Sequence, residues 1–167
     1  MKQEIITIIL AMTPTVEAHG AIALAIGAFK FSPLKAFLLS VLGTSLIIAP
    51  LLIFWHKLVD FFMTRSYHLN RFFTWLFRYT RERHTHHFRT FGESETIAPS
   101  RLAFWKAVGL YVFVAIPGPL TGIWAGTVAA FVFGIPIFYS VLALFLGALT
   151  VAGIDVLVLS GFFSLIR

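Results

Sequence analysis

Three ionisable residues lie in stretches of the sequence that are otherwise apolar: Glu17, His19 and Asp155. An ionised acid at the centre of a bilayer costs about 2.5–3.5 kcal/mol on insertion scales, so a chain keeps one there for a reason. For Glu17 two interpretations stand side by side. It is either a proton or cation site, or a structural acid that satisfies N–H groups at the start of its own helix.

His19 and Asp155 each have two interpretations as well. His19 follows Glu17 by two residues, so the two side chains point to different faces of a helix. His19 serves either in a proton relay or as a packing residue. Asp155 either faces the same cavity as Glu17 or lies near the interface as a polar residue of its helix.

Prolines interrupt two of the apolar stretches, at Thr13-Pro14-Thr15 and at Pro117-Gly118-Pro119. Proline is tolerated at the first helical position, so we expect new helices to begin at Pro14 and Pro119, capped by Thr13 and Gly118. Helix N-termini carry partial positive charge and free N–H groups. Two such ends facing each other would hold an anion such as a carboxylate or phosphate, beside the hydroxyls of Thr13, Thr15 and Thr121.

Gly122 and Gly126 form a G-x-x-x-G pattern around Trp124. Small faces of this kind let helices approach closely, and permeation along them is the alternative interpretation. Trp124 either gates a cavity or fills it. The candidate substrate and ion site therefore consists of Glu17, His19, Thr13, Pro14, Thr15, Pro117, Gly118, Pro119, Thr121, Gly122, Trp124 and Asp155.

The elements that must position these residues follow from composition. The chain has 167 residues, of which 59% are hydrophobic and 12% charged, as in an integral membrane protein. A helix needs about 20 residues to cross the hydrocarbon core, and the pieces on either side of each proline break are shorter. We expect broken hairpins at about 4–30 and 102–134, and full crossings at 34–60 and 136–165.

The two halves of the chain repeat the same order of features. A spacing of 19 residues separates Pro14 from Pro33 and also Pro117 from Pro136, and each crossing carries an early glycine, Gly43 or Gly147. A hairpin returns to its own side and a crossing changes side, so the second half is inverted relative to the first. This predicts membrane repeats at 1–63 and 102–167 with both termini outside. A bundle of four full spans is the alternative.

The middle of the chain is basic. Nine of the 13 Lys and Arg residues lie between 56 and 106. By the positive-inside rule region 64–101 is cytoplasmic. The aromatic residues among these charges favour an anionic lipid surface over nucleic acid. His84, His86 and His87 are read as a solvated stretch, and we expect no metal, no cofactor and no enzyme activity, because no catalytic motif is readable.

Two blocks of sequence carry a resemblance. "VAIPGPLTGIWAGTVAAFVFGI" and "PTVEAHGAIALAIGAFKFSPLKAFLLSVLG" resemble the two signature blocks of the small multidrug export proteins. The family commonly has Arg where this chain has His19, and Pro where it has Ala23. That family is similar to the DedA/VTT group, which implies two re-entrant hairpins in an inverted repeat and a prokaryotic inner membrane. The resemblance implies Glu17 as the membrane acid and Pro117, Gly118, Pro119 and Thr121 as the second hairpin tip.

The sequence thus predicts an all-α integral membrane protein, an inverted repeat of a re-entrant helical hairpin plus a transmembrane helix. We expect a transporter that couples protons or ions to movement of a small amphipathic or lipid-linked substrate. A lipid scramblase or flippase without ion coupling is one alternative, and a structural membrane protein that transports nothing is another. The expected partners are anionic lipids along 56–106 and a second copy of the chain.

Overall fold

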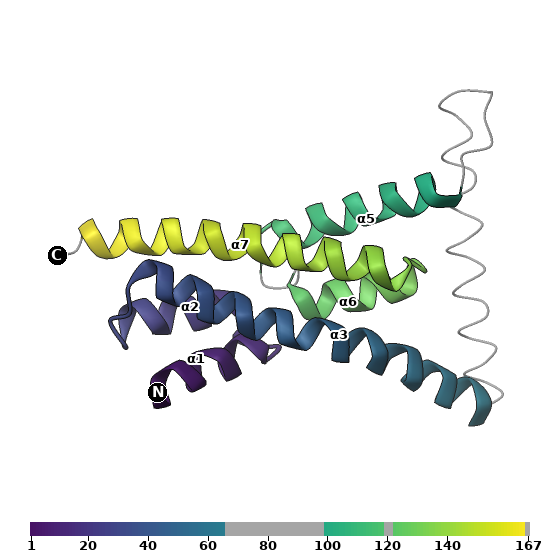
Figure 1. The fold of residues 1–167 in the computed structure, drawn as a ribbon, viewed down its shortest axis with the longest axis horizontal. Helices are drawn as coiled ribbons and strands as arrows, with labels where there is room; N and C mark the ends of the chain where they lie inside the picture. The colour runs from purple at the N-terminus through teal and green to yellow at the C-terminus, as the bar shows by residue number, and fades with distance from the viewer. Residues whose placement is uncertain (66–98, 119–121, 166–167) are drawn as a thin grey trace.

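The computed structural model describes residues 1–65, 99–118 and 122–165 of the chain (Figure 1). Every regular element within these ranges is a helix, which confirms the predicted all-helical class. The helices are α1 (Lys2–Met12), α2 (Glu17–Gly27), α3 (Pro33–Arg65), α5 (Pro99–Ala115), α6 (Ile123–Val132) and α7 (Ile137–Leu165). Most of the basic region predicted at 64–101 lies outside the described residues, and so do His84, His86 and His87.

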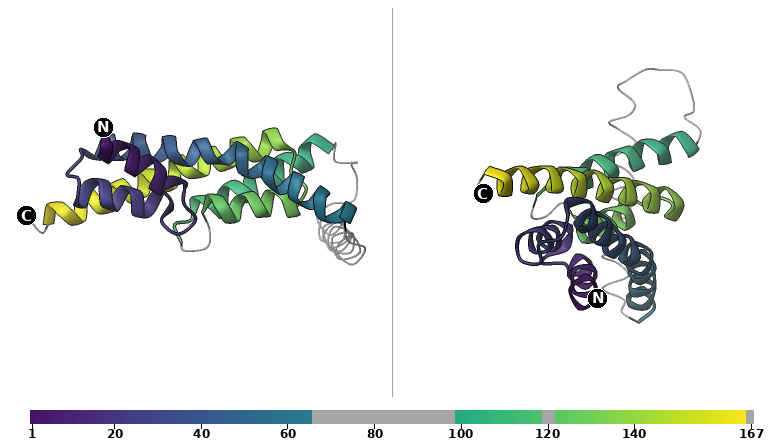
Figure 2. Two further views of the ribbon diagram at one scale, coloured as in Figure 1. Left: turned by 90° about the horizontal axis from the view of Figure 1, so that it is seen from below. Right: turned by 60° about the vertical axis from the view of Figure 1, so that its left-hand side comes forward.

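The two long helices, α3 and α7, are apolar and long enough to cross a membrane. Their apolar segments are Pro33–Trp55 and Ile137–Phe162, of 23 and 26 residues. At 1.5 Å per residue each segment exceeds the roughly 30 Å hydrocarbon core. The two helices lie side by side and run in opposite directions (Figures 1 and 2).

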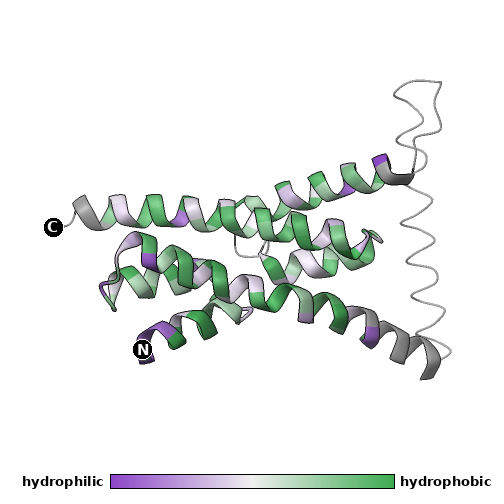
Figure 3. Cartoon of the chain, in the orientation of Figure 1, coloured by the Kyte–Doolittle hydropathy of each residue, from purple (hydrophilic) through white to green (hydrophobic). Residues whose placement is uncertain are grey.

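The outward faces of the long helices are apolar. On α3, Leu34, Leu38, Leu42 and Leu46 follow one another at a four-residue spacing and are each 48–68% exposed. On α7, Phe138, Leu157 and Val158 are exposed as well. Hydrophobic residues dominate all the described helices (Figure 3). Large apolar residues left exposed over such lengths are typical of a surface covered by lipid chains rather than water.

The four shorter helices form two pairs at opposite ends of the long axis. Helices α1 and α2 lie at one end, and α5 and α6 lie at the other (Figures 1 and 2). With 11, 11 and 10 residues, α1, α2 and α6 are each about half as long as a membrane crossing requires. The last residue of α1, Met12, meets the start of α6 at Trp124.

The helices after the breaks begin later than the sequence predicted. Helix α2 begins at Glu17 rather than Pro14, and α6 begins at Ile123 rather than Pro119. The backbone of Glu17 is left-handed (φ 46°), which separates a turn at residues 14–16 from the helix, because an α-helix requires negative φ. The N-cap residues are therefore Val16 and Gly122, in place of the predicted Thr13 and Gly118.

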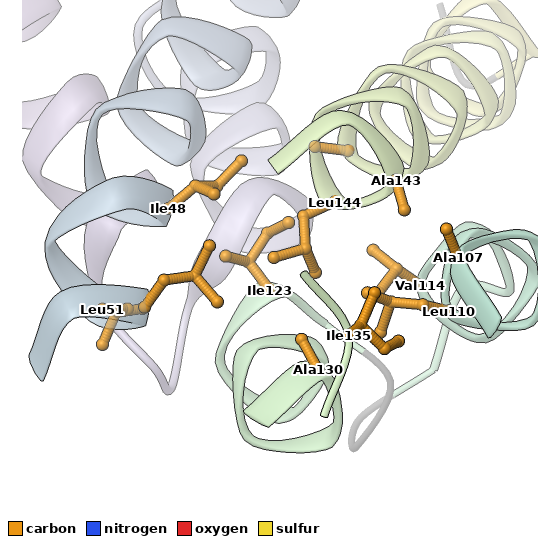
Figure 4. Close-up of a cluster of buried hydrophobic side chains, with 12 residues drawn as sticks. Ile48, Leu51, Ala107, Leu110, Val114, Ile123, Ala130, Ile135, Ala143 and Leu144 are labelled. Atoms are coloured by element: carbon orange, nitrogen blue, oxygen red, sulfur yellow. The ribbon is translucent and has the colours of Figure 1, made fainter. Parts of the chain in front are cut away.

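The larger core cluster joins α5, α6 and α7 to the middle of α3. Ile48, Val114, Ile123 and Leu144 come from these four helices and point toward one another (Figure 4). A Cβ atom added at Gly126 would lie 2.6 Å from both Leu144 and Val114, so the glycine allows this close packing. Helix α6 is thereby held firmly, with its N-terminus directed at the first helix pair.

An early glycine of each long helix contacts the first short helix of its own half. A Cβ atom at Gly43 of α3 would lie 2.5 Å from the Ile8 carbonyl of α1. A Cβ atom at Gly147 of α7 would lie 2.8 Å from Val114 of α5. The two glycines that the sequence placed at equivalent positions thus make equivalent close contacts in space.

Candidate functional site

The carboxylate of Glu17 lies at the N-terminus of α6, a helix from the other half of the chain. Its Oε1 atom accepts a hydrogen bond from the backbone N–H of Trp124, at 3.4 Å. A Cβ atom added at Gly122, the N-cap of α6, would lie only 1.5 Å from Oε2. The carboxylate therefore occupies the space that any side chain at position 122 would need, beside the partial positive charge of the helix end.

Trp124 holds the first helix pair through a second hydrogen bond. Its indole Nε1 donates to the carbonyl oxygen of Met12 at 3.2 Å. Met12 is the last residue of α1, and its carbonyl has no partner further along that helix. We call the turn between α1 and α2 the first tip. Trp124 thus binds both sides of the first tip, with its backbone N–H on Glu17 and its indole on the end of α1.

The left-handed backbone of Glu17 is part of this arrangement. A non-glycine residue in this conformation stores strain of about 1–3 kcal/mol, which the surrounding contacts must offset. The conformation lies at the junction between the 14–16 turn and α2, beside the contact with α6. Backbone strain of this kind is common at functional sites, and Glu17, which carries it here, is half-buried.

His19 and Asp155 form an ion pair between α2 and α7. The Nδ1 atom of His19 lies 2.6 Å from Oδ2 of Asp155, and the two side chains are 32% and 14% exposed. His19 follows Glu17 by two residues on α2. The first turn of α2 therefore contacts α6 through Glu17 and α7 through His19.

The remaining residues of the predicted site contribute less directly. The hydroxyl of Thr13 donates to the Leu10 carbonyl at 2.7 Å and so caps α1, while Pro14 and Thr15 are exposed. Pro117 is exposed and Gly118 is half-buried at the end of the described α5 segment. Pro119 and Thr121 lie outside the described residues.

The structure gives Glu17 a partner in the other half of the chain, because its carboxylate accepts a hydrogen bond from Trp124 of α6. The predicted place for an anion between two helix ends is taken, at α6, by the protein's own carboxylate. No three His, Cys, Asp or Glu side chains gather as a metal site within the part of the chain that the structure describes.

Sequence reasoning missed the partners rather than the residues. It identified Glu17, His19, Gly122, Trp124 and Asp155 one by one. It did not join His19 to Asp155, since 136 residues separate them. The sequence signal for this pair was that both residues are ionisable and lie in apolar stretches. Ionisable residues in such surroundings usually pair with one another, because an unpaired charge there is costly.

Comparison with known proteins gives one finding. The sequence model of a family described as "Putative small multi-drug export protein" matches residues 17–154, well over half of the chain. The matched segment begins at Glu17 and ends one residue before Asp155. No curated protein and no solved structure matches this chain.

Proposed function

The chain belongs to this small multi-drug export family, and from that premise we propose a membrane transporter in which Glu17 couples proton or ion binding to movement of an amphipathic substrate. The family description and the two apolar helices support a membrane transporter at the coarse level. The role of Glu17 goes further. It is supported by one observation above all: this acid from the first helix pair lies on the N-terminus of α6 in the second.

The membrane arrangement belongs to the proposal. We assign α1–α2 and α5–α6 as re-entrant hairpins that enter from opposite sides, with α3 and α7 as the crossings of an inverted repeat. The opposite placement of the two pairs, the antiparallel long helices and the equivalent contacts of Gly43 and Gly147 support this assignment. It agrees with the two re-entrant hairpins that the DedA-like resemblance implies, and with secondary transporters, in which broken helices meet at the membrane midplane.

The coupling step follows from the charge of Glu17. In its ionised form the carboxylate accepts the Trp124 N–H and is attracted by the dipole of α6, so the two tips stay together. Protonation removes the negative charge and with it most of this attraction. The tips then separate more readily, and a substrate can pass between them or bind to the uncovered end of α6.

The His19–Asp155 pair has a supporting role in this mechanism. It connects α2 to α7, and His19, which is partly exposed, follows Glu17 by two residues on α2. A histidine changes its charge near neutral pH and can pass protons between solvent and an acid. We therefore propose that His19 and Asp155 carry protons to and from Glu17.

The orientation and partners complete the proposal. Region 64–101 faces the cytoplasm of a prokaryotic cell, both termini lie outside, and the basic residues between 56 and 106 contact anionic lipids. The two crossings within the described residues enclose little space, so the transport path forms in a homodimer. Cysteines introduced into this cysteine-free chain at Lys30 and Arg167, labelled from outside intact cells, test this orientation.

The decisive experiment measures transport by the full chain in proteoliposomes. Ethidium serves as the amphipathic probe, with and without an imposed pH gradient. We expect gradient-driven ethidium flux for the natural sequence, and Glu17→Gln should slow it at least about tenfold. Glu4→Gln is the matched control, because Glu4 is an acid of α1 that pairs with Lys35, away from the tips.

Two outcomes would count against the proposal. Flux through Glu17→Gln that keeps the natural pH dependence removes Glu17 from the coupling step. A second arm follows transbilayer movement of a fluorescent phosphatidylglycerol without any gradient. Lipid movement of equal rate in both variants, without ethidium flux, would favour the scramblase alternative.

A further inference from the structure

A pocket of about 500 Å³ lies between α5 and α6, away from the Glu17 contact. Its walls include Leu102, Leu110 and Phe113 of α5 and Ala129 of α6, and the connection to α7 closes it with Phe133 and Ile135. Its volume falls within the range of about 300–1,000 Å³ that is typical of sites for small ligands. The proposed coupling mechanism does not use this pocket.

The length of the pocket matches one lipid chain in one leaflet. The lining residues of α5 run from Leu102 to Phe113, which corresponds to about 16 Å of helix. Half of the roughly 30 Å hydrocarbon core is about 15 Å. Trp105, Phe113 and Phe133 are 37–60% exposed at its edge, so the apolar interior opens toward the surroundings.

Lys106 places a positive charge at this apolar pocket. Of the lining residues, which all belong to the described part of the chain, it is the one that carries a charge. Its Nζ donates to the Phe133 carbonyl at 3.0 Å, so the ammonium is held at the C-terminal end of α6. An ammonium has three donors, and two remain for a phosphate. Arg101, exposed one turn before Trp105, adds a second positive charge to α5.

Gly109 keeps the pocket open. It belongs to the lining, and a Cβ atom added there would meet no atom within 4 Å. A glycine inside a helix costs roughly 0.5–1 kcal/mol relative to alanine, and packing between protein atoms gives no reason for it here. The open volume beside Gly109 is instead available to a ligand.

We propose that the pocket between α5 and α6 binds one acyl chain of an anionic phospholipid, whose phosphate pairs with Lys106. The apolar walls fit a hydrocarbon chain, the length fits a single leaflet, and the positive charge selects an anionic headgroup. The bound lipid fills the space between the two helices of the second pair.

The test uses the full chain in nanodiscs that contain equal amounts of phosphatidylglycerol and phosphatidylcholine. Native mass spectrometry then counts the lipids that remain on the protein. We expect the natural chain to retain one phosphatidylglycerol in preference to phosphatidylcholine. Gly109→Leu fills the pocket and should lower this retention about tenfold, while Lys106→Gln should abolish the preference between the two lipids.

Gly161→Leu is the matched control. Gly161 also lies within a helix, and a Cβ atom there meets no atom within 4 Å, but it is far along α7 from the pocket. We expect its lipid retention to equal that of the natural chain. Equal retention of the two lipids by the natural chain, or undiminished retention by Gly109→Leu, would overturn the proposal.

A second measurement covers the case in which Gly109→Leu does not fold. Phosphatidylglycerol with a photoreactive group in its acyl chain is crosslinked to the natural protein, and the labelled peptides are identified. We expect labels within 102–113 and 129–135. Labels spread evenly over the exposed faces of α3 and α7 would show that the lipid is merely annular, against the proposal.

Discussion

The two short helix pairs share one backbone plan and differ in chemistry. Helices α1 and α2 pack more extensively on each other than α5 and α6 do, and the second pair leaves a pocket between its helices. The first pair carries Glu17 and His19. The second supplies a glycine and backbone N–H groups at the tip, with no acid among its described residues. Two similar helix pairs can thus place a charged group in one pair and its binding partner in the other.

The connections after the two pairs show the same relationship. Helices α2 and α6 are both followed by a residue in the left-handed conformation, Lys30 (φ 55°) and Gly134 (φ 60°). In each case the next backbone N–H bonds back to the helix end, from Phe31 to Ala25 and from Ile135 to Ala130. The second half uses the residue type that favours this conformation, and the first half tolerates a strained lysine.

The largest effect is expected from filling the space beside Gly122 of the second pair, which the Glu17 carboxylate of the first pair occupies. Gly122→Ala places a Cβ atom where Oε2 of Glu17 lies, so the carboxylate must leave α6. We expect at least about a tenfold loss of gradient-driven ethidium flux in proteoliposomes. Gly161→Ala is the control. Glu17→Ala combined with Gly122→Ala should be no worse than either change alone, because both remove the same contact.

A smaller effect is expected where each pair is bonded to α7. Asp155→Asn removes the charge that pairs with His19 and should lower the free energy of unfolding by about 1.5–3 kcal/mol. Tyr111→Phe is the matched change in the second half, since it removes a neutral bond of 3.2 Å to Thr150. It should cost only about 0.5–1.5 kcal/mol. The free energy of unfolding of both variants is measured with denaturant. Equal decreases for Asp155→Asn and Tyr111→Phe would contradict the expected difference between the contact with a charged residue and the neutral contact.

The smallest effect concerns the outer end of the first pair. Glu4 bonds to Lys35 of α3, and this bond together with the N-terminal charge holds the pKa of Glu4 below its ordinary value of 4.5. A lowered pKa stabilises the fold above pH 4.5, and this contribution is lost as the pH falls through the folded value. The pair is exposed, so the effect is small and screened by salt.

Thermal unfolding of Glu4→Gln checks this last prediction. At neutral pH and low salt the variant should melt slightly below the natural chain. As the pH falls below 4.5 the difference between the two melting temperatures should shrink, because Glu4 takes up a proton and the contribution of its lowered pKa is lost. A difference that grows on acidification would contradict the assigned sign.

Much of the architecture could be predicted because it depends on local properties of the chain. Helix-breaking prolines at Pro14 and Pro117 marked the places where α1 and α5 end. The exact start of α2 could not be predicted, since Glu17, where the backbone turns left-handed, also contacts a helix that is distant in sequence. The pocket beside Gly109 was missed for a similar reason: an open space is a property of several helices together.

The sequence by itself determined the class of protein, the helical segments and the ionisable residues at issue, because hydropathy, proline geometry and charge act over short distances. Only the tertiary structure decided that Glu17 meets α6, that His19 meets Asp155, and that α5 and α6 enclose a pocket. Each of these joins segments or faces whose meeting depends on how α3 and α7 pack. That packing, and the packing of the shorter helices on α7, comes from many weak contacts. Gly126 of α6 lies close to Leu144, and Gly147 lies close to Val114 of α5, and no local pattern specifies these partners.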